Sequence, residues 1–328
     1  MWLQIGLSSD FPRGGAVQRV TRWGEELVAY RARSGRLVVH RAVCPHLGAH
    51  LGGGTVRGEC LECPFHGWQF HPDGGVQYVP GARRLPARAH LDTFATHEVG
   101  GVAFVFPREV RDAVAPPAFP AAITAELQRP GFRSSFSRTQ VRANLGEVQE
   151  NAADSAHLQI VHRPMITGAM PFRSSMGNSG EFITEGVMSL RVGGEVEMLV
   201  RCIDPCSTIT SSTSRYYGSD VLSFGAQITE KHIDLIFVIR TAKNAPVIGY
   251  AIHAMTRHKL ATSLDEDRPV WSEKVWLEQP IVSDADGPIS AYRRWLAAFE
   301  AGSNASGPGA PERVAAHRDT AAPLRERR

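Results

Sequence analysis

Two short segments, each carrying one cysteine and one histidine, constrain this chain more than any other feature. The first is Cys44-Pro45-His46, and the second, after sixteen intervening residues, is Cys63-Pro64-Phe65-His66. Two thiolates and two imidazoles on two loops match the needs of a [2Fe–2S] cluster in which Cys binds one iron and His the other. Because neutral imidazole replaces anionic thiolate, such a cluster accepts an electron at a higher potential than an all-Cys cluster. The segments therefore predict electron transfer, with Cys44, His46, Cys63 and His66 as ligands.

A zinc site and a disulfide framework are the alternatives for these residues. Zinc takes the same ligands, but a zinc finger has its two Cys on one hairpin and its two His on a helix. Here each loop contributes one of each, and Pro and Gly accompany both. Five Cys in 328 residues are too sparse, and odd in number, for a disulfide framework. Cys60 imitates a C-x-x-C partner of Cys63, and we interpret it as a small buried residue.

The composition is that of a globular protein with a sizeable core, since 43% of the residues are hydrophobic and 21% are charged. A net charge of +3 gives no reason to expect a nucleic-acid partner. No apolar run approaches the roughly 18–20 residues that span a bilayer, so we expect no membrane segment. Reduced thiols at the cluster favour a cytoplasmic location.

A length of 328 residues suggests about two domains. Residues 1–115 are rich in Gly, Val and turn pairs, which predicts a small antiparallel β domain. A second domain is expected over residues 116–302. Residues 303–328 are rich in Ala, Pro and Arg without periodicity, and we expect them to form a disordered tail.

The second domain combines two periodicities. Residues 144–162 have helical spacing, and residues from about 181 to 255 alternate as strands do. After residue 285 the apolar residues again fall on one face of a helix. The expected fold class is α+β, in which a twisted antiparallel sheet with helices follows the small β domain.

A second constellation, Asp154, His157 and His162, lies in the first helical stretch. On a helix Asp154 and His157 share a face, whereas His162 requires the helix to bend or unwind before Arg163-Pro164. Two His and one distant carboxylate form the facial triad of a mononuclear non-haem Fe(II) site, which leaves positions open for O₂. Such spacing is often a coincidence when it occurs alone. In the same chain as the Cys/His loops it indicates an iron site.

The strings CPHLGAHL and CPFHGWQF resemble the Rieske proteins, and with the Asp154 motif the chain resembles the Rieske non-haem iron oxygenases from about residue 2 to 300. The resemblance implies two cofactors, a [2Fe–2S] Rieske cluster and a mononuclear Fe(II) in a helix-grip-like catalytic domain. It implies that Asp154 relays the electron, because a carboxylate on the outer N–H of His157 orients the ring and raises its basicity. It also implies transfer from the cluster of a neighbouring subunit, hence a homotrimer with head-to-tail contacts.

The third iron ligand is expected far downstream. The family places an Asp at the start of a late helix in a pattern that resembles D-x-x-V-W, and Asp267 matches it because Val270 and Trp271 follow at the required offsets. Spacing alone leaves four other carboxylates open: Asp265, Glu266, Asp284 and Asp286.

The segment Asp286-Gly287-Pro288, with Arg293-Arg294-Trp295 after it, resembles the 3-ketosteroid 9α-hydroxylase oxygenases and the cholesterol 7-desaturases. The strings CLECPFHGWQF and ENAADSAHL are similar to the desaturases. Two departures are Leu296, where an aromatic residue is usual, and the expected lack of the desaturases' N-terminal membrane segment. The resemblance implies an oxygenase component that uses O₂ to hydroxylate or desaturate a bulky polycyclic, steroid-like substrate.

No convincing GxGxxG motif indicates a nucleotide site. The electrons are therefore expected from a separate NAD(P)H-dependent reductase, directly or through a ferredoxin. The alternatives are an oxygenase for a smaller aromatic or natural-product substrate, a Rieske electron carrier, and a binding protein that has lost catalysis. The pair His157 and His162 disfavours the carrier, because a carrier needs no second iron.

Overall fold

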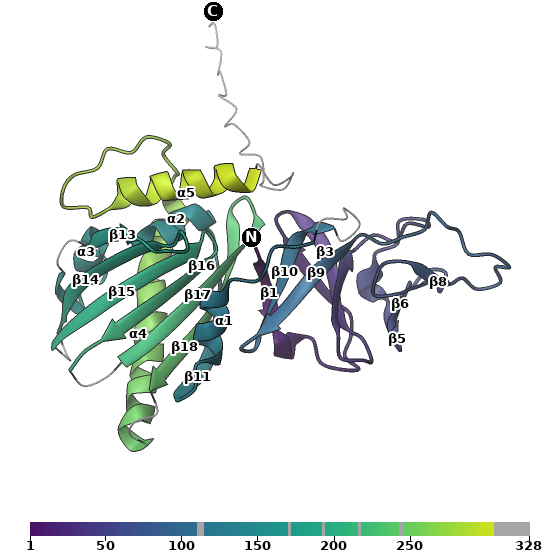
Figure 1. The fold of residues 1–328 in the computed structure, drawn as a ribbon, viewed down its shortest axis with the longest axis horizontal. Coiled ribbons are helices and arrows are strands. Elements are labelled where there is room, and N and C mark those ends of the chain that lie inside the picture. The colour runs from purple at the N-terminus through teal and green to yellow at the C-terminus, as the bar shows by residue number, and fades with distance from the viewer. Residues whose placement is uncertain (110–114, 170–171, 192–193, 216–217, 243–245, 305–328) are drawn as a thin grey trace, which may run out of the picture.

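A computed structural model of the chain describes residues 1–109, 115–169, 172–191, 194–215, 218–242 and 246–304. Two β-rich parts lie along the longest axis, with the N-terminal part at the right of Figure 1 and the larger sheet with its helices at the left. The described strands pair in an antiparallel manner. The expected α+β class is confirmed.

The N-terminal part contains two sheets. The first has six strands in the order β1 (Leu3–Leu7), β10 (Val102–Glu109), β9 (Thr93–Val99), β4 (Leu37–Arg41), β3 (Glu25–Arg31) and β2 (Gln18–Arg22). The second has four strands, which are β5 (Thr55–Arg57), β6 (Cys60–Glu62), β7 (Gln69–Phe70) and β8 (Val76–Tyr78). This small sheet lies at the end of the molecule farthest from the large sheet (Figure 1).

The C-terminal part is built on one large sheet. Its strand order is β11 (Phe132–Val141), β18 (His232–Ala242), β17 (Gly218–Thr229), β16 (Ser207–Thr213), β15 (Gly194–Asp204), β14 (Phe182–Leu190) and β12 (Ile166–Ala169), and β13 (Arg173–Met176) also pairs with β14. The helices are α1 (Ala121–Gln128), α2 (Leu145–Gln149), α3 (Ala156–Ile160), α4 (Pro246–Glu273) and α5 (Ile289–Asn304).

The long helix α4 covers one face of this sheet because side chains alternate along β18. Leu235 and Phe237 face α4 and pack against Leu264. Ile236 and Val238 point to the opposite face and pack against the N-terminal part. Because successive side chains alternate between the two faces of the sheet, β18 contributes to two separate hydrophobic cores.

Two expectations differ from the observed elements, and two others fall on or beside residues outside the described ranges. Residues 246–255 were assigned to the alternating region but begin α4, because an apolar helix that packs on a sheet also carries closely spaced apolar residues. Asp267 lies near the end of α4 rather than at the start of a helix, and Pro269 is inside that helix. The tail at 303–328 lies outside the described residues from 305 onward, and the boundary at 115 adjoins 110–114, which are also outside them.

The two parts share a hydrophobic cluster. Trp2 and Phe104 of the N-terminal part pack with Phe224 and Ile236 of the large sheet. The rings of Phe104 and Phe224 meet edge to face, with centroids 5.2 Å apart. Aromatic pairs of this geometry stabilise a contact beyond the area that they bury. The shared cluster therefore joins the two parts as one packed unit.

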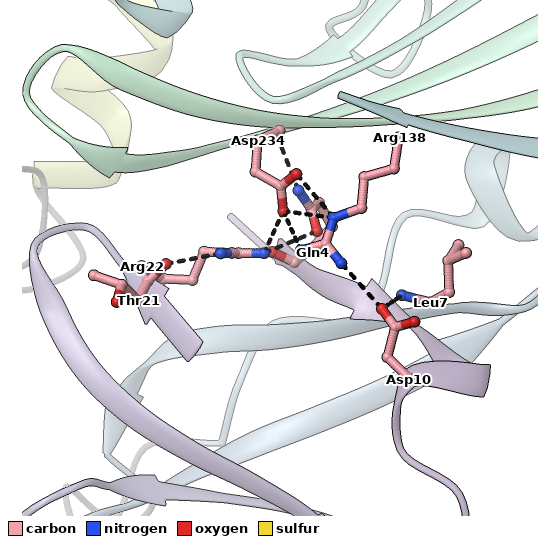
Figure 2. Close-up of polar contacts among 7 residues, drawn as sticks. All are labelled: Gln4, Leu7, Asp10, Thr21, Arg22, Arg138 and Asp234. Carbon is pink, nitrogen blue, oxygen red and sulfur yellow. Dashed lines mark hydrogen bonds and ion pairs between the residues drawn. The ribbon is translucent and has the colours of Figure 1, made fainter. Parts of the chain in front are cut away.

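A buried carboxylate, Asp234 of β18, lies at the same joint (Figure 2). Arg22 of β2 and Arg138 of β11 each place a guanidinium nitrogen 2.7 Å from its Oδ2. Gln4 of β1 donates to the Asp234 main-chain carbonyl at 3.0 Å. Asp10 receives a second Arg138 nitrogen at 3.1 Å nearer the surface. One carboxylate thus holds arginines from both parts.

Burial shapes the charges of this network. Burial raises the pKa of Asp234, but hydrogen bonds from Arg138 and the positive charge of Arg22 outweigh that effect, so the pKa lies below its usual value. Burial lowers the pKa of Arg22 to about 10, although Asp234 opposes the shift. Both groups are therefore charged at neutral pH, and each depends on the other for compensation.

Replacement of Asp234 by Asn should destabilise the chain strongly. The change leaves the buried Arg22 charged without its counter-charge and leaves Arg138 with Asp10 alone. Removal of one partner of a buried ion pair costs about 3–5 kcal/mol, so we expect the free energy of unfolding in urea to fall by that amount. Because the folded-state pKa of Asp234 is lowered, its stabilisation is present above the ordinary Asp pKa of about 3.9 and is lost as the pH falls below it.

Glu273→Gln is the matched control. Its carboxylate is 81% exposed and lies 3.8 Å from Arg142. Exposed pairs contribute about 0–1 kcal/mol. An Asp234→Asn loss no greater than that of the control would contradict a dependence on the buried pair.

Candidate functional site

The two Cys/His loops are built alike. The first follows β4, and the second connects β6 to β7. In each loop the Cys amide donates to the carbonyl five residues ahead, at 2.8 Å for both Cys44 and Cys63. The amides of Gly48 and Gly67 donate back to the carbonyls of Cys44 and Cys63, at 3.0 and 3.1 Å. Both Gly have positive φ, 76° and 69°, which other residues rarely adopt, so the shared Gly explains the shared loop form.

These loops place the thiols inside and the imidazoles outside. Cys44 and Cys63 are 2% and 3% exposed, while His46 is half-buried and His66 is exposed. The two imidazole centroids are 4.7 Å apart. Trp68 stacks on His46 with centroids 4.3 Å apart and holds that ring in place. The structure thus brings the four expected cluster ligands together as a buried thiol pair and an outward imidazole pair.

The donor set fits a [2Fe–2S] cluster with two Cys and two His ligands. Burial, assisted by the neighbouring Cys63 thiol, raises the pKa of Cys44 to about 11, so iron binding there must release a proton. Neither Cys44 nor Cys63 is in a disulfide, and Cys60 is buried as expected. Because the imidazoles are outward, an electron can leave such a cluster from its His side.

The segment that carries Asp154 and His157 is a helix broken in two places. A short 3-10 turn, Glu150–Ala152, follows α2, and α3 begins only at Ala156. The break at 153–155 comes earlier than the expected one, because Asp154 acts as a cap and its Oδ1 accepts from the His157 amide at 3.1 Å. A second break follows Ile160, as expected, and it frees His162 to turn toward His157.

The ring of His157 is fixed by the main chain. Its Nδ1 lies 2.6 Å from the Asp154 carbonyl oxygen. A carbonyl only accepts, so Nδ1 carries the proton and Nε2 is the nitrogen available to a metal. The Asp154 carboxylate is farther from the ring, with Oδ1 3.7 Å from Nδ1. The expected contact between the carboxylate and the ring is therefore replaced by one from the same residue's carbonyl.

His162 lies between two consecutive carboxylates of α4. Its Nδ1 is 2.7 Å from Glu266 Oε2, and its Nε2 is 3.5 Å from Asp267 Oδ1. Ligand atoms of His157, His162 and Asp267 all lie within 4.8 Å of one another. Two imidazoles and one carboxylate at this separation fit the donor set of a mononuclear non-haem iron.

Electrostatics at this site also favour a cation. Burial lowers the pKa of His162, but hydrogen bonds and negative charge from Asp267 and Glu266 outweigh it, so the pKa is raised. The same two carboxylates would stabilise a metal ion beside the neutral ring. Sequence reasoning treated Glu266 as an alternative ligand, because residue order does not reveal which imidazole nitrogen a carboxylate meets.

The other candidate carboxylates lie apart from the two histidines. Asp265 is 76% exposed and faces Arg268 at 3.5 Å. Asp286 accepts from the Ser283 amide at 2.6 Å, and Asp284 is exposed. Asp267 is thus the carboxylate that faces the interior on the side where both histidines lie.

Contacts from the loop after α4 and from α5 support the residues next to Asp154. The Glu150 carboxylate is paired with Lys274 at 3.1 Å and with Arg293 at 2.5 Å. Gly287 packs so closely that a Cβ there would lie 2.7 Å from the Ala153 carbonyl oxygen. These contacts tie the loop after α4 and the start of α5 to the residues that precede α3.

Comparison with known proteins agrees with this arrangement. The Rieske [2Fe-2S] domain family matches residues 1–105, and the family described as the 3-Ketosteroid 9alpha-hydroxylase C-terminal domain matches residues 112–299. Within the described residues, no helix is both long and apolar enough to cross a membrane.

Curated relatives cover most of the chain. Cholesterol 7-desaturase nvd of Xenopus laevis is 27% identical over 322 residues, which are 89% of this chain and 70% of the relative. A 3-ketosteroid-9-alpha-monooxygenase oxygenase component of Rhodococcus rhodochrous is 26% identical over 324 residues, which are 91% of this chain and 82% of the relative.

Solved structures share the fold. Dicamba monooxygenase bound to dicamba gives a TM-score of 0.78 at 18% identity and covers 93% of this chain and 98% of its own. NdmA of Pseudomonas putida CBB5 with caffeine gives a TM-score of 0.73 at 20% identity, with 92% and 91% covered. With both family matches and these relatives, the chain belongs to the Rieske oxygenases whose catalytic domain is of the 3-ketosteroid 9alpha-hydroxylase type, enzymes that use a [2Fe–2S] cluster and a mononuclear iron.

Proposed function

We propose that this chain is the oxygenase component of a monooxygenase that hydroxylates or desaturates a bulky polycyclic, steroid-like substrate. Its Rieske domain would occupy residues 1–115 and its catalytic domain residues 116–302. The observation that carries the proposal is the meeting of His157, His162 and Asp267 in a chain that also has the two Cys/His loops. Cys44, His46, Cys63 and His66 would hold the cluster.

The cofactors supply the chemistry and this chain's residues direct it. When bound, the cluster delivers single electrons and the mononuclear iron activates O₂. His157 and His162 each have Nδ1 engaged by an oxygen, which leaves Nε2 free for the metal. Hydrogen bonds to the outer nitrogens of metal-bound His orient the rings and raise their basicity.

Asp154 is proposed as the electron relay. Burial raises the pKa of its carboxyl, but contacts with His157 outweigh that effect, so the pKa is lowered and the group stays anionic. Its side chain is 25% exposed, and its carbonyl is 2.6 Å from His157 Nδ1. The anionic carboxylate is thus partly exposed at the surface while its Oδ1 lies 3.7 Å from His157 Nδ1.

We propose that the electron crosses a subunit boundary in a head-to-tail homotrimer. The cluster-bearing strands β5 to β8 lie at one end of the long axis, and α3 lies at the other (Figure 1). Exposed apolar side chains accompany the outward imidazoles, since Phe65 is 62% and Leu47 is 65% exposed. Apolar surface of this kind marks a contact with another protein.

Apolar surroundings of α3 support a steroid-like substrate. Leu158, next to the iron-site His157, belongs to a hydrophobic cluster that includes partly buried Met165, Met188 and Met198. Methionine side chains are flexible and polarizable, and they adapt to large apolar ligands. A polycyclic hydrocarbon skeleton suits such apolar surroundings better than a small polar molecule does.

The proposal also covers the source of the electrons and the cellular location of the protein. A separate NAD(P)H-dependent reductase, directly or through a ferredoxin, would reduce the cluster. All five Cys are free, which suits a reducing compartment and supports a cytoplasmic location.

His157→Ala should remove the mononuclear iron and leave the cluster. The variant loses one of the two imidazole donors, so we expect one iron fewer per chain by elemental analysis and no steroid-dependent O₂ uptake with a reductase. The control is His258→Ala, which replaces an exposed His on α4 and should keep the iron content and the steroid-dependent O₂ uptake. Steroid-dependent uptake that survives His157→Ala would exclude His157 as a ligand of the catalytic iron, and a chain that shows no uptake in its unmodified form would contradict the proposed activity. Uptake stimulated only by small aromatic compounds would favour the alternative substrate class.

Asp267→Asn should weaken Fe(II) binding at the mononuclear site by more than tenfold, because it removes the anionic ligand while keeping the size of the side chain. Asp265→Asn is the matched control, since it removes a carboxylate that is 76% exposed on the same helix. Titration of cluster-loaded protein with Fe(II) measures the Fe(II) affinity of each variant. Equal Fe(II) affinity in the two variants would exclude Asp267 as the third ligand.

Asp154→Asn should leave the cluster spectrum and the iron content intact and nearly abolish electron transfer between them. Asn can still cap α3 by accepting from the His157 amide, so the effect isolates the lost charge. Single-turnover oxidation of the reduced cluster measures the rate. A rate equal to that of the unmodified protein would refute the relay role.

A further inference from the structure

The strongest contact between a carboxylate side chain and an imidazole at the iron site is made by Glu266, not by Asp154. Glu266 Oε2 lies 2.7 Å from His162 Nδ1, whereas the Asp154 carboxylate lies 3.7 Å from His157 Nδ1. Within the described part of the chain, no Lys or Arg forms an ion pair with Glu266. Its carboxylate is therefore directed to the ring of His162.

We propose that Glu266 is a positioning residue that holds His162 with Nε2 toward the iron. The inference rests on the proposed function, because it takes His162 as an iron ligand. An anionic carboxylate only accepts, so His162 Nδ1 donates to it and the opposite nitrogen, Nε2, keeps its lone pair for the metal. The negative charge also makes that lone pair a stronger donor.

Helix geometry explains why this role falls to Glu266 and the ligand role to Asp267. Consecutive residues of a helix project about 100° apart. Both reach one imidazole only because the ring lies across α4, with Nδ1 toward Glu266 and Nε2 toward Asp267. A metal bound by Nε2 and Asp267 is on the far side of the ring from Glu266, so Glu266 is excluded as a simultaneous ligand of that metal.

His162 depends on a side chain in a way that His157 does not. The acceptor for His157 Nδ1 is a main-chain carbonyl, which every substitution at Asp154 retains. The acceptor for His162 Nδ1 is the Glu266 carboxylate. Imidazole rings have a broad, roughly two-fold torsional preference about the bond to the ring. Without Glu266, His162 loses the contact that selects one ring orientation and one tautomer.

The test compares Glu266→Ala, Glu266→Gln and the control Asp265→Ala. Chelator competition with Fe(II) on cluster-loaded protein measures metal affinity. Loss of an outer hydrogen-bond partner weakens metal binding about 10–100-fold, which we expect for Glu266→Ala. Glu266→Gln should fall between it and the unmodified protein, because the amide oxygen accepts without charge. Asp265→Ala should bind Fe(II) normally.

A second readout needs no iron at the mononuclear site. In protein that lacks this iron, the hydrogen-bonded Nδ1–H of His162 should give a downfield proton resonance that Glu266→Ala abolishes and Asp265→Ala retains. Should Glu266→Ala fail to fold, Glu266→Gln supplies both measurements. Unchanged Fe(II) affinity in the Glu266 variants, or an equal loss in Asp265→Ala, would overturn this inference alone. Absence of any Fe(II) site in the unmodified protein would overturn the proposed function as well.

Discussion

The ion pairs of Asp234 hold the N-terminal part, which carries the two Cys/His loops, against the large sheet on which α4 packs. They bring Arg22 of the N-terminal part and Arg138 of the large sheet to one buried carboxylate, beside the shared core of Phe104 and Phe224. A joint that is both charged and apolar resists sliding, because any shift separates charges in a dry environment. It therefore fixes strands β5 to β8 and α3 at opposite ends of the molecule (Figure 1).

The two histidine pairs are held by different physical means that suit their places. His46 is held by the stacked ring of Trp68, and His66 is exposed. An aromatic support of this kind engages the face of the ring and leaves its nitrogens available for other contacts. His157 and His162 are instead held through Nδ1 by oxygens in a more buried setting. Hydrogen bonds there fix the tautomer of both rings, and Glu266 adds negative charge beside His162, an arrangement that would suit a divalent metal ion.

The sequence was informative where a site is made by neighbours in the chain and weaker where it is made by packing. The loops around Cys44 and Cys63 are local, so their Pro and Gly identify them together with the ligands. Asp267 could be proposed only by resemblance, because its approach to His162 depends on how α4 crosses the sheet. The contact of Glu266 with Nδ1 depends on ring orientation, which no spacing encodes. The strand expected near residue 250 failed for a related reason, since an apolar run fits a buried helix equally well.

The segment Asp286-Gly287-Pro288, whose sequence resembles one branch of the family, also packs against the residues that precede α3. Gly287 has φ of +87°, and a Cβ there would lie 2.7 Å from the Ala153 carbonyl oxygen and 2.9 Å from Ser155 Oγ. Any larger residue would require a shift at Gly287 or in residues 153–155, which contain Asp154 and precede α3. Because Asp154 contacts His157 through both its carboxylate and its carbonyl, a shift of residues 153–155 would move the His157 ring. The segment that resembles one branch of the family thus also has a packing role, since the close approach that requires Gly supports the residues around Asp154.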